Sequence, residues 1–417
     1  MKWSIPILLC AAVWSSHPET IYKSLDPLSV SEHLAFYTAY GSEEALDHVW
    51  HLLTKHHYHP PPRPDYGLDL PDLDLDGLIS ITFARPWEPR KELSESQIEL
   101  VERLGAHFYN RNRKGHKVWK RERLAELPSR EIDIARSLLL YEFDDRAAIR
   151  QYEASLDMMA LQIAARLPEG ASYEEMVRAT SRFIFHEMAF RFPPHSKHAK
   201  EIDTYTFLPS VLDSRQGVCL GVSIIYLAVA QRLGLPLEIV TPPGHIYVRL
   251  DDELNIETTA RGIHYPSEVY LGINTRSLQL RSEKEVVGLA FMNQAARFWQ
   301  EGSHERAIEL YEQARLFIED DPLLKMFLGY QYFLVGKRGK ARELLKQVAG
   351  TPFTHAVAAE TTPEDILRGY VDADALKAVY LDVDQTRASI IAKQKRLQRA
   401  VRRCPRFRDA LFHLAVT

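Results

Sequence analysis

Three residues between positions 215 and 257 have side chains that could together carry out nucleophilic chemistry: Cys219, His245 and Glu257. A cysteine attacks a carbonyl carbon as its thiolate, so it needs a base that takes its proton. The base in turn needs a third group that fixes its orientation and its tautomer. The stretch RQGVCLGVSIIYLAVAQRLGLPLEIVTPPGHIYVRLDDELNIE contains one candidate for each of these roles.

The element that positions the thiol is predicted to be a helix from Cys219 to Leu233. Apolar residues recur at intervals of three and four and form one stripe, namely Val218, Val222, Ile225, Val229 and Leu233. Gly234 and Pro236 end the helix. Cys219 therefore falls in the first turn, where free N–H groups and the helix dipole favour a negatively charged sulfur.

The other two residues are predicted on a β-hairpin. After a short strand at 237–240, a Pro-Pro-Gly corner leads to His245, which begins a strand of alternating polar and apolar residues. An acidic turn at 251–253 returns the chain to a second arm that carries Asn255, Glu257 and Thr259. Either Glu257 or Asn255 could bond one imidazole nitrogen while the other nitrogen faces Cys219.

This segment resembles the bacterial transglutaminase-like superfamily, whose members share a papain-like Cys-His-Asp arrangement. The resemblance extends from about 129 to 272 and is closest from 213 to 259. It implies that Cys219 is the nucleophile, His245 the base and Glu257 the acidic partner. This chain departs from the family in having Glu257 where the family has Asp, and the extra methylene changes how far the carboxylate reaches toward the imidazole. Some relatives with the same Pro-Gly-His corner lack the cysteine, so the fold alone does not imply catalysis.

The rest of the chain before position 280 reads as mostly helical. Apolar positions predict one or two helices at 30–57, a long helix at 152–167 and another at 173–188. Helices followed by a small antiparallel sheet make an α+β order. We expect a helical extension with a Pro-rich and acidic linker at 21–128, and the transglutaminase-like domain at 129–280.

The C-terminal third, at 285–417, carries an internal repeat. Gly302, Ala307 and Ala314 recur as Gly336, Ala341 and Val348, at one constant displacement along the chain. The period of about 34 residues resembles that of tetratricopeptide repeats, which are all-α arrays that bind proteins or peptides. We therefore expect a protein or peptide partner on this array.

Composition excludes several classes of function. The 417 residues have a net charge of -4, so we expect no nucleic-acid partner. Three cysteines in three separate regions suggest neither a disulfide framework nor a zinc site, and we expect no cofactor and no metal.

The segment at 1–20 resembles a secretory signal peptide. Lys2 precedes an apolar run from Ile5 to Trp14, and cleavage near Ser15 or Ser16 is expected. An exported protein, periplasmic or secreted, is the favoured interpretation, and a buried first helix in a cytoplasmic protein is the alternative. Apart from this signal we expect no membrane contact.

Two hypotheses of function follow. In the first, the chain is a thiol-dependent acyl hydrolase or transferase that acts on amide or peptide bonds and is targeted by its repeats. Cys219 would form the acyl intermediate. His245 would act as general base and then as general acid, and Glu257 would orient His245. The backbone N–H of Cys219, helped by Gln216, would stabilise the oxyanion. In the second, the domain is a catalytically inactive scaffold and the repeats hold a protein partner.

Overall fold

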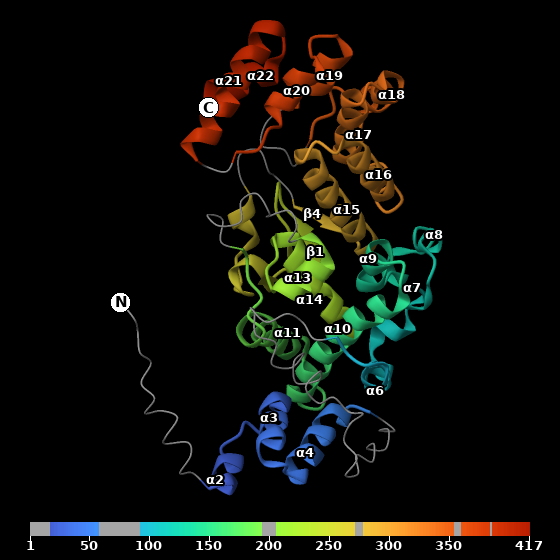
Figure 1. Ribbon diagram of the computed structural model, residues 1–417, viewed down its shortest axis with the longest axis vertical. Helices are drawn as coiled ribbons and strands as arrows, with labels where there is room; N and C mark the ends of the chain where they lie inside the picture. Colours follow the sequence, from blue (N-terminus) through green and yellow to red (C-terminus); the bar gives the residue numbers. More distant parts are fainter. Residues whose placement is uncertain (1–16, 58–91, 194–205, 272–277, 354–359, 384–385) are drawn as a thin grey trace.

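The computed structural model describes residues 17–57, 92–193, 206–271, 278–353, 360–383 and 386–417. The chain runs along the long axis of the molecule, from the N-terminal helices at one end to the C-terminal helices at the other (Figure 1). The expected signal peptide, apart from residues 17–20, and the expected linker at 58–91 lie outside the described residues. No helix among the described residues has the length and apolar character needed to span a bilayer.

The helices that precede the sheet run from the N-terminal end of the molecule to its centre (Figure 1). They are α2 (Pro18–Lys23), α3 (Val30–Tyr40), α4 (Glu43–Thr54), α6 (Glu95–Leu104), η1 (Gly105–His107), η2 (Tyr109–Asn112), α7 (Lys114–Lys117), α8 (Arg121–Leu124), η3 (Ser129–Glu131), α9 (Ile134–Glu142), α10 (Arg146–Arg166), α11 (Tyr173–Ser181), η4 (Arg182–Glu187), α13 (Leu208–Ser214) and α14 (Cys219–Leu233). The helices predicted at 30–57 and 152–167 are confirmed as α3, α4 and the longer α10.

The helix predicted at 173–188 is divided in two. α11 ends at Ser181, and η4 is a single π-helical turn in which the N–H of Met188 reaches back to the carbonyl of Phe183. The wider turn holds Phe183, Ile184 and Phe185, all of which are buried. A pattern of 3.6-residue periodicity cannot anticipate such a bulge, because the bulge adds a residue to the turn.

α14 is the central helix of the domain. Its start at Cys219 and its end before Gly234 are as predicted, but its surroundings are not. Every residue from Leu220 to Leu233 is buried, so the predicted single apolar stripe is wrong. α9, α10 and α13 pack around α14, which explains the burial on all sides.

The sheet has four antiparallel strands in the order β3-β2-β1-β4. The strands are β1 (Glu238–Thr241), β2 (Tyr247–Arg249), β3 (Asn255–Ile256) and β4 (Gln279–Arg281). Val248 pairs with Ile256, so the predicted hairpin is confirmed, although His245 and Glu257 lie just outside its strands. The fourth strand was not predicted. Helices with this small sheet make the fold α+β.

The C-terminal helices are α15 (Glu283–Gln300), α16 (His304–Arg315), α17 (Pro322–Leu334), α18 (Arg338–Val348), α19 (Thr362–Leu367), α20 (Ala373–Val379), α21 (Arg387–Arg403) and α22 (Arg408–Val416). α15 packs on α16, and α17 packs on α18, as two helix pairs that the predicted repeat period relates. Gly302 and Gly336 close the first helix of each pair with φ of 79° and 77°. That these pairs are tetratricopeptide repeats stays a prediction.

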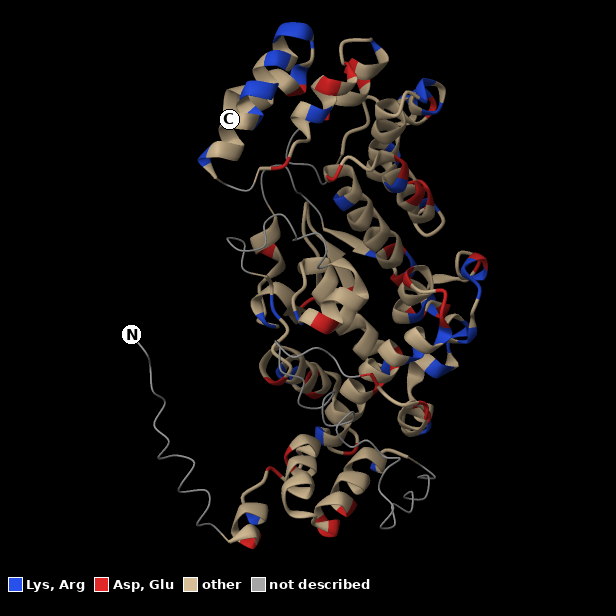
Figure 2. Ribbon diagram, viewed as in Figure 1, with Lys and Arg blue, Asp and Glu red and all other residues tan. Residues whose placement is uncertain are grey.

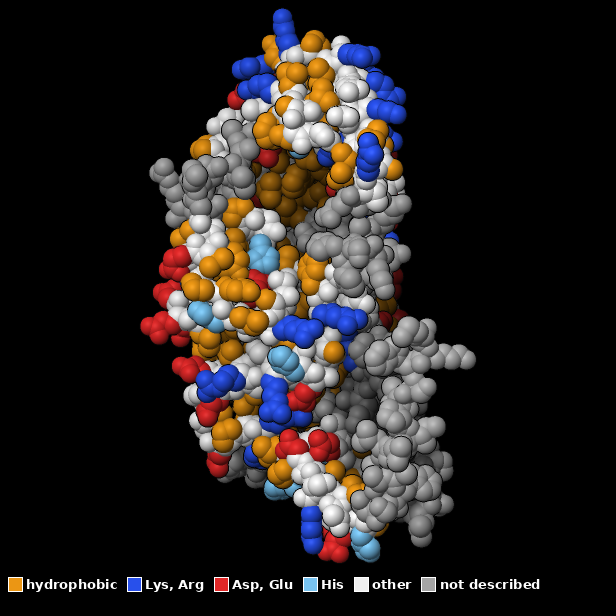
Figure 3. Space-filling view, turned by 90° about the vertical axis from the view of Figure 1, so that its left-hand side faces the viewer, with side chains coloured by type: hydrophobic (Ala, Val, Ile, Leu, Met, Phe, Trp, Pro, Cys, Tyr) orange, Lys and Arg blue, Asp and Glu red, His pale blue; other side chains and the backbone are white. Residues whose placement is uncertain are grey.

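Lys and Arg gather on α21, which has no acidic residue (Figure 2). A space-filling view shows a hollow between the C-terminal helices and the central domain, and hydrophobic side chains lie in it (Figure 3).

Candidate active site

Cys219 is the first residue of α14 and is partly exposed. The residue before the helix is Val218, which has no side-chain acceptor to cap the first N–H groups. Gly217 lets the preceding loop lie close to the helix, because a Cβ added there would come within 2.7 Å of the side chain of Val222. The first turn of α14 therefore carries the thiol next to uncapped N–H groups.

His245 follows the turn at 242–244, and its N–H donates to the carbonyl of Pro242 at 3.1 Å. Its Nε2 lies 2.6 Å from Oε2 of Glu257. The side chain of Cys219 lies close enough to contribute to the raised pKa of the imidazole. Since Nε2 is engaged by the carboxylate, Nδ1 is the nitrogen left for the sulfur. The three side chains that the sequence predicts for the site are thus brought together.

The electrostatics of His245 and Glu257 favour an ion pair between them. Burial acts to lower the pKa of His245, but hydrogen bonds and charge from Cys219 and Glu257 outweigh it and raise the pKa to about 9. Burial acts to raise the pKa of Glu257, but hydrogen bonds from His245, Thr259 and Tyr270 lower it to about 2. At neutral pH the imidazole is therefore protonated and the carboxylate is ionised.

Glu257 directly follows β3, and its backbone N–H donates to the carbonyl of Ile263 at 3.0 Å. Its side chain is the partner of the imidazole. Asn255, the alternative that the sequence left open, instead donates to the carbonyl of Tyr265 at 2.7 Å and to Ser267 Oγ at 3.0 Å. The side chain of Asn255 in β3 thus bonds to the loop that follows, and Glu257 is the residue that bonds to His245.

Two residues at the site were not predicted to take part. Thr259 donates from its N–H and its hydroxyl to Oε1 of Glu257, at 3.0 and 2.6 Å. Tyr270 donates its hydroxyl to Oε2 of the same carboxylate. Thr259 lies on the predicted second arm, so its spacing was a usable signal. Tyr270 lies in an irregular segment with no periodic pattern, and the sequence offered no such signal.

Gln216, the predicted helper of the oxyanion, lies three residues before the thiol. Its backbone pairs with Arg191, and its side-chain Oε1 is buried without a hydrogen-bond partner among the described residues. Its role in stabilising an oxyanion stays a prediction.

Residues 150–276 match the family model described as the transglutaminase-like superfamily. Residues 150–276 form a transglutaminase-like domain. This domain contains Cys219, His245 and Glu257 and lies inside the segment at 129–280 that the sequence assigned to it. Neither the curated proteins nor the solved structures include a match to the chain.

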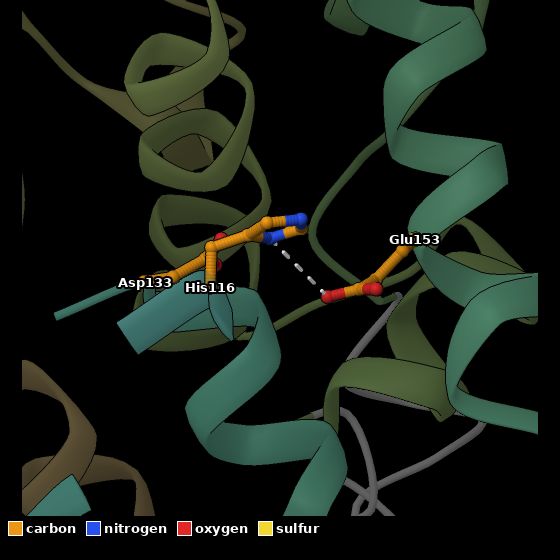
Figure 4. A group of neighbouring side chains, drawn as sticks. All are labelled: His116, Asp133 and Glu153. Atoms are coloured by element: carbon orange, nitrogen blue, oxygen red, sulfur yellow. Dashed lines mark hydrogen bonds and ion pairs between the residues drawn. The ribbon is translucent and has the colours of Figure 1, made fainter. Parts of the chain in front are cut away.

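A second group of side chains lies where the preceding helices meet α10. His116, Asp133 and Glu153 have potential ligand atoms that all lie within 4.8 Å of one another (Figure 4). Three elements supply them, namely α7, the residue before α9, and α10.

The donors already present explain this group without a metal ion. Arg136 holds both oxygens of Glu153, at 2.7 and 2.6 Å. Oδ2 of Asp133 accepts from Asn110 at 3.0 Å and lies 3.0 Å from Nδ1 of His116. A divalent cation would have to displace the guanidinium. The group is a buried charge network that ties the preceding helices to α10.

Proposed function

We propose that the chain is a thiol-dependent acyl hydrolase or acyltransferase that acts on amide or peptide bonds. The observation that carries this proposal is the convergence of three side chains: Nε2 of His245 bonds to Glu257, and Cys219 lies close enough to His245 to raise its pKa. Cys219 would react as a thiolate beside the protonated His245, which is the reactive form of a nucleophilic cysteine.

The reaction proceeds in two halves. The Cys219 thiolate attacks the carbonyl carbon of an amide, and His245 gives its proton to the nitrogen as the C–N bond breaks. The amine leaves and an acyl thioester remains on the sulfur. Neutral His245 then takes a proton from water or from an amine, whose oxygen or nitrogen attacks the thioester. The C–S bond breaks, and the thiolate and imidazolium form again.

The second substrate decides the class of enzyme. Water gives a peptidase or amidase, and an amine gives a transglutaminase. The oxyanion of each half-reaction would meet the N–H of Cys219 at the uncapped start of α14, with Gln216 as the proposed helper.

The C-terminal helices are the proposed site of the partner. The pairs α15–α16 and α17–α18 repeat the same packing and the same glycine turns, which supports an array of tetratricopeptide type that holds a protein or peptide substrate. Export through the N-terminal segment remains part of the same proposal.

The test is capture of the acyl-enzyme. Wild type and Cys219→Ala are incubated with a library of activated peptide amides and thioesters, and the mass of the intact protein is measured. We expect an added acyl group on Cys219 and none in the variant. Equal acylation of both proteins would contradict the proposal. If Cys219 acylates no faster than Cys404 with any member, the chain is instead the inactive scaffold with a protein-binding array.

A further inference from the structure

The Glu257 carboxylate receives four hydrogen bonds, two on each oxygen. Thr259 supplies both bonds to Oε1 from its N–H and its hydroxyl. His245 and Tyr270 share Oε2. The residue is only 4% exposed, so these bonds replace its solvation almost completely.

The large number of hydrogen bonds compensates for the length and flexibility of the glutamate side chain at this position. Its side chain is one methylene longer than that of aspartate, and it must give up more rotamer freedom to hold one geometry. An imidazole is oriented only by a carboxylate that stays in place. Thr259 reaches Glu257 from the adjacent turn, and Tyr270 reaches it from η7 (Ser267–Tyr270), so the carboxylate is held from two separate elements.

Tyr270 is itself fixed by stacking. Its ring lies against Tyr247 of β2, with ring centres 4.7 Å apart and planes inclined by 19°. The ring also lies over His245, with centres 5.7 Å apart and planes inclined by 21°. Tyr247 is fully buried, so the sheet provides a rigid base for this stack.

We propose that Tyr270 is a positioning residue, whose hydroxyl fixes the Glu257 carboxylate and whose ring covers the imidazole of His245. Tyr270 acts through these two residues and touches no reacting atom. This inference rests on the proposed function, because it concerns the orientation of the base that activates Cys219.

The charge state of the phenol suits this role. Burial first, and then the hydrogen bond and charge of Glu257, raise the pKa of Tyr270 above its ordinary value. The hydroxyl therefore remains a donor at every pH at which the imidazolium exists. Because the bond goes to a carboxylate, its charge makes it stronger than a bond between neutral groups.

The test variant is Tyr270→Phe, which keeps the stacked ring and removes only the hydroxyl. Two quantities are measured in the full-length protein: the pKa of His245 by NMR titration of its ring, and the rate of Cys219 alkylation by iodoacetamide against pH. We expect the imidazole pKa to fall by about half a unit and the upper transition of the alkylation profile to move down with it. A merely structural loss would lower the melting temperature without moving this pKa.

The matched control is Tyr265→Phe, which removes a hydroxyl from a 40% exposed tyrosine in the same segment. It should leave both measurements unchanged. The second variant is Thr259→Val, which removes a hydroxyl donor from Oε1 of Glu257. It should also lower the imidazole pKa.

The outcomes separate this inference from the function on which it rests. If Cys219 of the wild type is alkylated no faster than an ordinary thiol, the proposed function fails. If Cys219 is reactive and Tyr270→Phe leaves both the pKa and the alkylation profile at their wild-type values, the positioning role is overturned and the proposed function stands.

Discussion

Replacing Glu257 with Gln removes the charge that stabilises the imidazolium while it keeps the shape of the side chain. The raised pKa of His245, about 9 against an ordinary 6.5, reflects net stabilisation of the protonated ring. At 1.36 kcal/mol per unit this amounts to about 3 kcal/mol. Interactions with Cys219 and with Glu257 both raise the pKa of His245, so we assign about half of the stabilisation to Glu257. The expected loss is then about 1.5 kcal/mol, or roughly tenfold in the ratio of protonated to neutral imidazole at a given pH.

The assay is the second-order rate of iodoacetamide alkylation at Cys219, followed by mass spectrometry from pH 4 to pH 10. In the wild type the rate should stay high through neutral pH and change near pH 9, where the imidazolium loses its proton. In Glu257→Gln the upper transition should move down by about one unit, so the two profiles should differ most between about pH 8 and about pH 9 and little at pH 7.

The raised pKa of His245 also determines how the stability of the native state depends on pH. Because the native pKa of His245 lies above its ordinary value, the pair stabilises the native state below pH 6.5. That contribution is lost as the pH rises through about 9. Cys404 is the internal reference, since burial raises its pKa and it lies far along the chain. Identical profiles for wild type and Glu257→Gln would refute the reasoning.

Three further predictions concern the scaffold. Asp157→Asn should lower the free energy of unfolding by about 3–5 kcal/mol in urea titrations, because the fully buried Arg232 would lose the negative charge that Asp157 places 2.6 Å away. The control is Glu19→Gln at an exposed ion pair, which should change the free energy of unfolding by less than about 1 kcal/mol. Burial raises the pKa of Glu142 to about 7, so native stability falls as pH rises from 4.5 to 7, and Glu142→Gln should raise the melting temperature at pH 8 and not at pH 4. Gly217→Val should slow Cys219 alkylation with little loss of far-UV circular dichroism, because its side chain would collide with the first turn of α14; an unchanged rate would contradict this.

The sequence predicted the elements that carry Cys219 and His245 better than it predicted the packing around them. Cys219 at a helix start and His245 after a Pro-Gly corner depend on local signals, which are glycine, proline and periodicity. The order of these elements also predicted the hairpin.

The remaining contacts depend on tertiary structure. β4 comes from a segment well beyond β1 in the sequence, as the pairing of Thr241 with Gln279 shows, and no local pattern marks it. Arg232 lies inside the domain because Asp157, far away in the sequence, neutralises it. Tyr270 joins the site only when η7 folds back on the sheet. Spacing within one segment cannot reveal such contacts.

The central claim is that His245 activates Cys219, and the most direct measurement is the alkylation rate of Cys219 in wild type and in His245→Ala at pH 7. The account predicts fast labelling of Cys219 over Cys404 in the wild type and loss of this preference in the variant. Equal labelling of Cys219 in the two proteins would contradict it.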